Sequence, residues 1–84
     1  MNMYPVDMMV LEAITRLVSH EPQTRISYEQ IEAALQITLS VRSIQRSVAR
    51  LENDAHLRRV GGMNRHGYRY ELSTLVELAI SVRR

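Results

Sequence analysis

Arginines recur between Ser40 and Leu51, in the run SVRSIQRSVARL, at spacings that place them on one side of a helix. The apolar face of this helix would hold Ile44, Val48 and Leu51. The outer face would hold Arg42, Arg46, Ala49 and Asn53. Because a guanidinium group pairs with phosphate oxygens or with the acceptor edge of guanine, this outer face has the chemistry needed to contact a nucleic acid.

Two further polar side chains, Gln45 and Arg50, lie at the edges of the outer face and are long enough to reach base edges or phosphates. The small side chain of Ala49 would let the helix backbone approach a partner closely. We therefore interpret residues 40–54 as a recognition helix, the element that enters the major groove of DNA and contacts base edges there.

A basic segment, GGMNRHG at residues 61–67, follows the arginine-rich stretch. It lies between residues 57–60 and 68–72, which have the composition and alternation of two strands. Its three glycines would supply the positive φ angles that a tight reversal needs. The pattern predicts a β-hairpin whose tip presents Asn64, Arg65 and His66.

The net charge of +2 is distributed unevenly along the chain. Residues 1–39 carry two arginines and five carboxylates, whereas residues 40–70 carry seven arginines and two carboxylates. A basic half set against an acidic half is the pattern expected of a protein that meets nucleic acid with one defined face.

Catalytic and metal chemistry have no support in the sequence. There is no Ser-His-acid arrangement, no phosphate-binding G-x-x-x-x-G-K run and no pair of carboxylates on one face. The chain has no cysteine, and the spacing of His20, His56 and His66 does not suit zinc, so no metal or cofactor is expected. Its 84 residues suit a single domain, residues 1–84. The apolar runs are too short for a membrane span or a signal peptide, so a cytoplasmic, nucleoid-associated location is expected.

The elements that would position the basic segments begin with an N-terminal helix over residues 8–19. Asp7 is a suitable N-cap for this helix, and Pro22 would end it. Its buried stripe would consist of Val10, Leu11, Ile14, Leu17 and Val18. Residues 24–26 would then form one short strand.

A second helix is predicted by the capping box of Ser27 and Gln30, S-x-x-Q. The third, arginine-rich helix would be capped by Ser40, with Thr38 as the alternative. Two apolar side chains of the short connection between these helices are expected to tuck under both of them, Ile37 and Leu39.

A last helix over residues 74–82 is predicted by the capping box of Thr74 and Glu77. Because a helix this short is marginal alone, its apolar face must pack either on the first helix or on a second copy of the protein. We expect a homodimer, although packing within one chain would satisfy the same residues. The face consists of Leu75, Leu78, Ala79 and Val82.

The order helix, short strand, helix, turn, helix, hairpin resembles the winged helix-turn-helix domains of bacterial and phage transcription regulators. The run LSVRSIQRSVARLENDAHLRRV resembles the family pattern in which a Ser opens the recognition helix, apolar residues anchor it, and a Leu-Glu pair leads to a strand with paired arginines. The resemblance covers residues 8–72. It implies a mostly helical α+β fold with a three-helix core, a two-stranded β-hairpin wing and a short C-terminal helix.

The resemblance also implies which side chains would contact DNA. Those facing the major groove would be Ser40, Arg42, Gln45, Arg46 and Arg50. Those along the backbone or in the minor groove would be Asn64, Arg65 and His66. The chain departs from the family at the turn before the first wing strand, where Ala55 and His56 stand in place of a glycine and a large apolar residue.

The expected function is sequence-specific binding of double-stranded DNA by a small transcription regulator, such as a repressor or a phage or plasmid control protein. The alternatives are a winged-helix module that binds another protein, and a winged helix that binds RNA. In the first alternative, the same basic face or the C-terminal helix would bind the other protein. The competing interpretation of the arginines is that they are simply solvated, or that Arg46 or Arg50 pairs with Glu52 or Asp54. No small-molecule ligand is evident.

Several aromatic and imidazole side chains have structural interpretations that we favour over functional ones. Tyr68 and Tyr70 are expected to face the core, with their hydroxyls in water, rather than to stack on bases. His56 and His66 are expected to be exposed polar residues.

Overall fold

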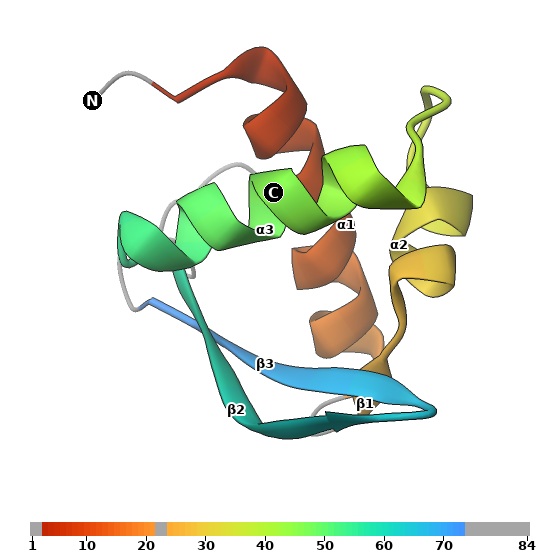
Figure 1. Ribbon diagram of the computed structural model, residues 1–84, viewed down its shortest axis with the longest axis vertical. Coiled ribbons are helices and arrows are strands. Elements are labelled where there is room, and N and C mark those ends of the chain that lie inside the picture. Colours follow the sequence, from red (N-terminus) through yellow and green to blue (C-terminus); the bar gives the residue numbers. More distant parts are fainter. Residues whose placement is uncertain (1–2, 22–23, 74–84) are drawn as a thin grey trace.

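Three helices and one three-stranded antiparallel sheet make up the part of the chain that the computed structural model describes, residues 3–21 and 24–73 (Figure 1). The helices are α1 (Pro5–His20), α2 (Tyr28–Ala34) and α3 (Val41–Asn53), and the strands are β1 (Arg25–Ile26), β2 (Leu57–Asn64) and β3 (Gly67–Leu72). The predicted α+β class is confirmed, and the layout is compatible with a winged helix. The predicted helix over 74–82 and its face, Leu75, Leu78, Ala79 and Val82, lie outside the described residues.

Helix α1 begins earlier than the sequence pattern predicts. Pro5 occupies its first turn, where the fixed φ of proline suits a helix and the missing N–H costs no hydrogen bond. Tyr4 stands at the N-cap without a side-chain capping bond, so the prediction of Asp7 as N-cap is wrong. The predicted buried stripe is confirmed, since Val10, Leu11 and Ile14 are buried and Leu17 and Val18 pack against the same core.

The two other helices start where their capping signals predict. The Ser27 Oγ accepts a hydrogen bond from the Gln30 backbone N–H at 3.1 Å, and the Ser27 N–H donates to Gln30 Oε1 at 2.8 Å. At α3, the Ser40 Oγ accepts from the Ser43 N–H at 3.1 Å, which makes Ser40 the cap and not Thr38. Local capping chemistry therefore fixes the start of both helices.

The connection between α2 and α3 buries fewer side chains than expected. Leu39 packs against the core, but Ile37 lies at the outside of the bend and is 40% exposed, so its predicted burial is wrong. Leu35 and Leu39 reach the core from the two ends of the connection, which leaves the residue at the middle of the reversal facing outward.

The sheet has the strand order β1-β3-β2, with β3 in the centre. Strand β1 pairs with β3 through Arg25 opposite Arg69 and Ile26 opposite Tyr68, so the short first strand joins the hairpin. The hairpin itself is longer than predicted, because β2 continues to Asn64 and only residues 65 and 66 form the turn. A register irregularity between residues 60 and 64 accommodates this extension.

Two of the three hairpin glycines adopt positive φ angles, namely Gly61 at 71° and Gly67 at 98°. Gly62 does not, so the prediction holds for two positions only. At Gly67 an added Cβ would lie 2.0 Å from the carbonyl oxygen of Ile26. The third strand can therefore approach β1 this closely only because residue 67 has no side chain.

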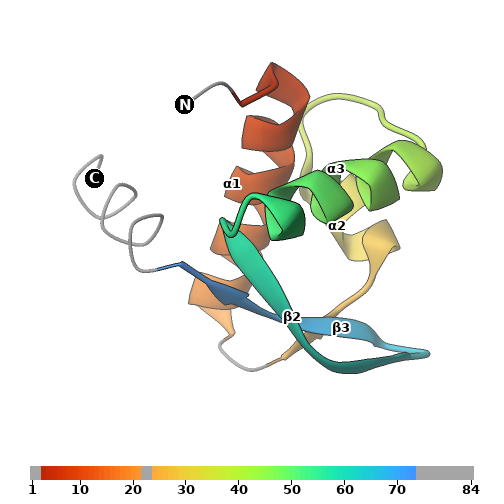
Figure 2. The same ribbon diagram turned by 60° about the vertical axis from the view of Figure 1, so that its left-hand side comes forward.

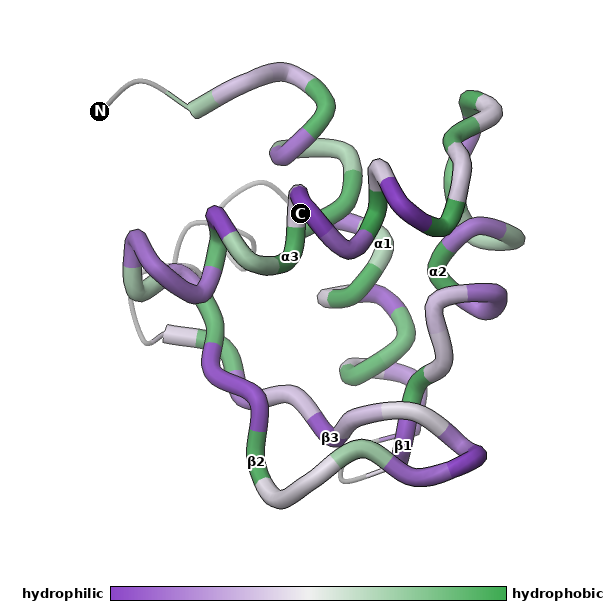
Figure 3. The backbone as a smooth tube through the Cα atoms, in the orientation of Figure 1, coloured by the Kyte–Doolittle hydropathy of each residue, from purple (hydrophilic) through white to green (hydrophobic). Residues whose placement is uncertain are grey.

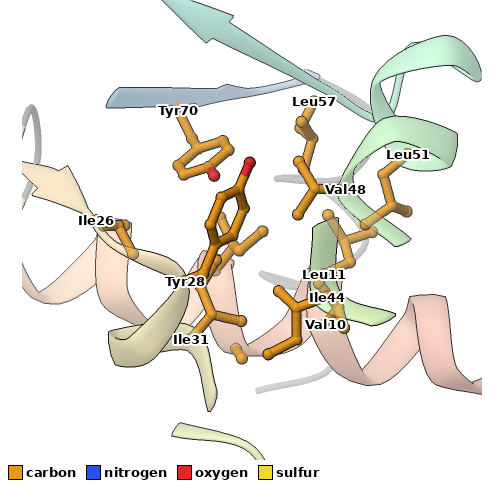
Figure 4. Close-up of a cluster of buried hydrophobic side chains, with 12 residues drawn as sticks. Val10, Leu11, Ile26, Tyr28, Ile31, Ile44, Val48, Leu51, Leu57 and Tyr70 are labelled. Carbon is orange, nitrogen blue, oxygen red and sulfur yellow. The ribbon is translucent and has the colours of Figure 1, made fainter. Parts of the chain in front are cut away.

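The hydrophobic core lies between the three helices and the sheet (Figure 4). Tyr70 points from β3 into this cluster, and its hydroxyl is buried without a hydrogen-bond partner among the described residues. The prediction that water contacts the Tyr70 hydroxyl is therefore wrong, because the side chain points into the core and buries the hydroxyl with the ring. Burial also raises the pKa of the Tyr70 phenol above its usual value.

The turn after α3 holds Ala55 at a φ of 61°, in the left-handed region that glycine usually occupies. His56 is buried rather than exposed, which corrects the prediction from sequence. Its backbone N–H donates to the Leu51 carbonyl at 2.9 Å, and its carbonyl accepts from the Ser73 N–H at 3.1 Å. These two backbone hydrogen bonds place His56 at the junction between α3 and the sheet, where it is buried.

Candidate nucleic-acid interface

The outer face of α3 is exposed along its length, as the helical spacing predicts. Ile44, Val48 and Leu51 are buried on the inner face, and hydrophilic and hydrophobic positions alternate along α3 in Figure 3. The exposed residues of the outer face are Ser40, Arg42, Gln45, Arg46, Ala49 and Asn53. Within the described part of the chain, neither Arg42 nor Arg46 forms a hydrogen bond or an ion pair with another residue.

Arg50 differs from this exposed set, because its guanidinium group is paired within the protein. Its Nε and Nη2 atoms donate to the two carboxylate oxygens of Asp7 at 2.9 and 2.7 Å. The guanidinium group also lies 5.2 Å from the centre of the Tyr4 ring. Arg50 therefore joins α3 to the first turn of α1, and it pairs with neither Glu52 nor Asp54.

Ser47, which the sequence did not single out, completes this contact. It is fully buried, and its hydroxyl donates to Asp7 Oδ1 at 2.6 Å. Asp7 is itself only 3% exposed, and its carboxylate receives three hydrogen bonds from α3. The bonds from Arg50, with a smaller contribution from Ser47, hold the pKa of Asp7 below its usual value despite the opposing effect of burial. Asp7 therefore stays ionised and orients α3 on α1.

Two other arginines are engaged on the sheet. Arg59 donates to Glu52 Oε1 at 2.6 and 3.1 Å, and its guanidinium group lies 4.8 Å from the centre of the Tyr68 ring. The hydrogen bonds from Arg59 lower the pKa of Glu52. On the exposed side of the hairpin, Arg58 pairs with Glu71. These paired arginines contribute to the fold and leave less charge available to a partner.

The hairpin tip carries the three predicted wing residues, all of them exposed. The Asn64 Oδ1 accepts from the His66 N–H at 2.8 Å and so shapes the turn. The Arg65 Nε donates to the His66 Nε2 at 3.2 Å. In both Figure 1 and Figure 2, this tip and the N-terminal end of α3 extend toward the same side of the molecule, beyond the rest of the sheet.

Arg25 contributes to the hairpin in a way that sequence reasoning missed. Its Nη1 donates to the carbonyl oxygens of Gly62 and Gly67, each at 2.8 Å, and so joins β1 to both strands near the tip. These partners are 37 and 42 residues away in the chain, and no local pattern marks the contact. The wing is therefore held against the body of the protein rather than extending alone.

The described residues bring charged and polar donors to one side of the molecule. Among residues 3–21 and 24–73, no group of three or more histidine, aspartate or glutamate side chains could hold a metal ion. None of the helices in this part of the chain is long and apolar enough to cross a membrane. The candidate interface therefore consists of the outer face of α3, with Arg42 and Arg46, and the hairpin tip, with Arg65.

Comparison with known proteins gave no relative: neither the protein-family models, nor the curated proteins, nor the solved structures contain a match to this chain.

Proposed function

We propose that the chain is a winged helix-turn-helix protein that binds double-stranded DNA sequence-specifically, as a small transcription regulator or a phage or plasmid control protein. Helix α3 enters the major groove, and the hairpin tip lies on the backbone or in the minor groove. The observation that supports this most is the division of the arginines. Arg50, Arg58 and Arg59 have carboxylate partners, whereas Arg42 and Arg46 have none among the described residues.

An exposed arginine without a carboxylate partner retains its donors for phosphate or guanine. Arg42 lies one turn of helix before Arg46, with Gln45 beside it, so these side chains leave α3 near its N-terminal end. That end is the part of a recognition helix that enters the groove most deeply. Arg42, Gln45 and Arg46 are accordingly the base-reading residues of the proposal, while Arg50 sets the angle of the helix.

We also propose that the protein acts as a homodimer, because one recognition helix contacts few base pairs and two half-sites increase discrimination. Its interface is the apolar face of residues 74–82, which lies outside the described residues. Leu78→Asp should then give a monomer. Light scattering at high micromolar concentration tests this, and a monomeric unmodified protein would contradict it.

Binding to random duplex DNA as a function of salt tests the central proposal. The association constant should fall steeply as salt rises, because bound protein releases counterions from the phosphates. The double variant Arg42→Ala/Arg46→Ala should weaken binding strongly. The matched control Arg58→Ala removes a charge that is paired with Glu71 and should have a smaller effect. Absence of salt-dependent binding by the unmodified protein would favour the protein-binding alternative instead.

A further inference from the structure

A polar pocket of about 540 Å³ lies between the hairpin tip and the segment that leads from β1 into α2. The described residues that line it include two arginines and a histidine but no carboxylate. Such a pocket carries net positive charge and attracts anions. The residues that line it are Thr24, Arg25, Ser27, Gln30, Arg65 and His66.

Arg25 is held in place before any ligand arrives. Both hydrogen bonds to the carbonyls of Gly62 and Gly67 come from Nη1, so the Nε and Nη2 donors have no partner among the described residues. The guanidinium group therefore needs little reorganisation to bind an anion, which reduces the entropic cost of binding. A planar group with two neighbouring free N–H donors matches two oxygens of one phosphate.

The turn of the hairpin contributes Arg65 and His66 to the lining of the pocket. Arg65 uses Nε to contact His66, and its terminal nitrogens have no partner among the described residues. Thr24 adds a hydroxyl close to β1. Two guanidinium groups and a hydroxyl in the lining of one pocket are suited to a tetrahedral anion with several acceptor oxygens.

We infer that this pocket, formed by β1 and the hairpin tip, binds a phosphate group. Two sources share this chemistry: a phosphodiester of the bound nucleic acid, or a free phosphate. The first source rests on the proposed function and extends it, because it adds Thr24 and Arg25 of β1 to the contacts made by Arg65. The second source does not depend on DNA binding.

Inorganic phosphate added to the full chain at constant ionic strength, followed by ¹H–¹⁵N NMR, tests the pocket directly. The amide signals of residues 24–27 and 64–67 should shift in a saturable manner, and Arg65→Gln should weaken phosphate binding by about tenfold. Thr24→Val should weaken it by a smaller factor without disturbing the hairpin. The control Arg58→Gln removes the same charge at the other end of the hairpin, opposite Glu71, and should leave the affinity unchanged.

A second arm adds duplex DNA to separate the two sources. If DNA abolishes the phosphate-dependent shifts and Thr24→Val lowers DNA affinity, the occupant is a backbone phosphate. If phosphate binds but DNA does not, the pocket binds free phosphate. The inference about the pocket then holds, and the proposed DNA binding is contradicted. If DNA binds while phosphate produces no shifts and Thr24→Val binds DNA like Arg58→Gln, the inference about the pocket is overturned and the proposed function survives.

Discussion

Asp7 and Arg50 form a bidentate ion pair, with N–O distances of 2.9 and 2.7 Å, between residues 43 positions apart in the sequence. The carboxylate is almost fully buried, whereas the Arg50 side chain is 42% exposed. Removing the charge from the buried partner should therefore cost stability, although less than in a fully buried pair. Asp7→Asn is expected to lower the free energy of unfolding by about 1 to 3 kcal/mol at neutral pH. Asp54→Asn, at an exposed residue, should change it little.

The Asp7–Arg50 pair should also make the free energy of unfolding depend on pH in the acidic range. Its partners hold the pKa of Asp7 in the folded chain below the ordinary value of 3.8, so the unfolded chain takes up the proton first as pH falls. The stabilisation is complete above about pH 5 and is lost as pH falls through the folded pKa. Urea denaturation at several pH values should show the difference between the unmodified protein and Asp7→Asn shrinking toward pH 2. A constant difference would contradict the role given to the Asp7 charge.

Ala55 adopts a φ of 61° at the turn after α3, a conformation that costs an L-residue about 1 kcal/mol. Ala55→Gly should therefore raise the free energy of unfolding by about 0.5 to 1 kcal/mol. Ala49→Gly, on the exposed face within α3, should lower it by a similar amount, because glycine disfavours a helix interior. Thermal unfolding of both variants measures whether the free energy of unfolding rises or falls. A destabilising effect of Ala55→Gly would rule out strain at this turn.

Gly67 and Gly62 offer a matched pair of substitutions in one hairpin. A Cβ at residue 67 would lie 2.0 Å from the Ile26 carbonyl oxygen, whereas a Cβ at residue 62 would meet no atom within 4 Å. Gly67→Ala should therefore separate β1 from β3 and destabilise the protein by more than about 3 kcal/mol, while Gly62→Ala should be tolerated. Circular dichroism with denaturant titration distinguishes them. Equal effects would mean that β1 is not packed as closely as described.

The helices were predictable from sequence because their signals are local. The 3.6-residue spacing of Ile44, Val48 and Leu51 defines the buried side of α3, and Ser27 and Ser40 cap helices within three residues of themselves. The α1 start was mispredicted, because Asp7 has the chemistry of a cap but is used by a partner far along the chain.

The long-range contacts of the candidate site were not predictable in this way. Nothing near Arg25 indicates that it holds the hairpin 37 and 42 residues later, and nothing near Arg50 indicates Asp7. An arginine on an exposed helix edge looks the same in sequence whether it serves the fold or a ligand. Which of the two applies depends on tertiary packing, so the sequence could not show that Arg50 pairs with Asp7 while Arg42 and Arg46 have no carboxylate partner among the described residues.

Tyr70 brings a hydroxyl into the core without a hydrogen-bond partner among the described residues. Burial of an unsatisfied hydroxyl is unfavourable, so Tyr70→Phe should keep the packing and raise the free energy of unfolding by up to about 1 kcal/mol. Tyr28→Phe is the control, since the Tyr28 hydroxyl accepts from Arg59 at 3.5 Å and its loss should be neutral or destabilising. A clear loss of stability in Tyr70→Phe would show that the hydroxyl has a partner.

Under the proposed function, α3 should determine the sequence specificity of DNA binding, whereas the hairpin tip should contribute affinity for DNA of any sequence. Arg46→Ala should weaken the preferred site by about 1 to 3 kcal/mol more than random DNA, which collapses the specificity ratio. Arg65→Ala should weaken both by similar factors and lower the salt slope by about one unit. Fluorescence titrations on specific and random duplexes at several salt concentrations measure both quantities. If Arg42→Ala and Arg46→Ala both leave the ratio unchanged, α3 is not the reading element.

On α3, Arg50 has a carboxylate partner whereas Arg42 and Arg46 have none among the described residues, and this division also bears on how the protein can evolve. Arg50 and Ser47 attach the helix to Asp7 from its edge and its buried side, and neither contact involves the outer face. Substitutions at residues 42, 45 and 46 therefore leave the contacts between α3 and Asp7 in place, so each variant should still fold. Under the proposed function, successive substitutions at these positions can change the preferred DNA sequence while every intermediate still folds.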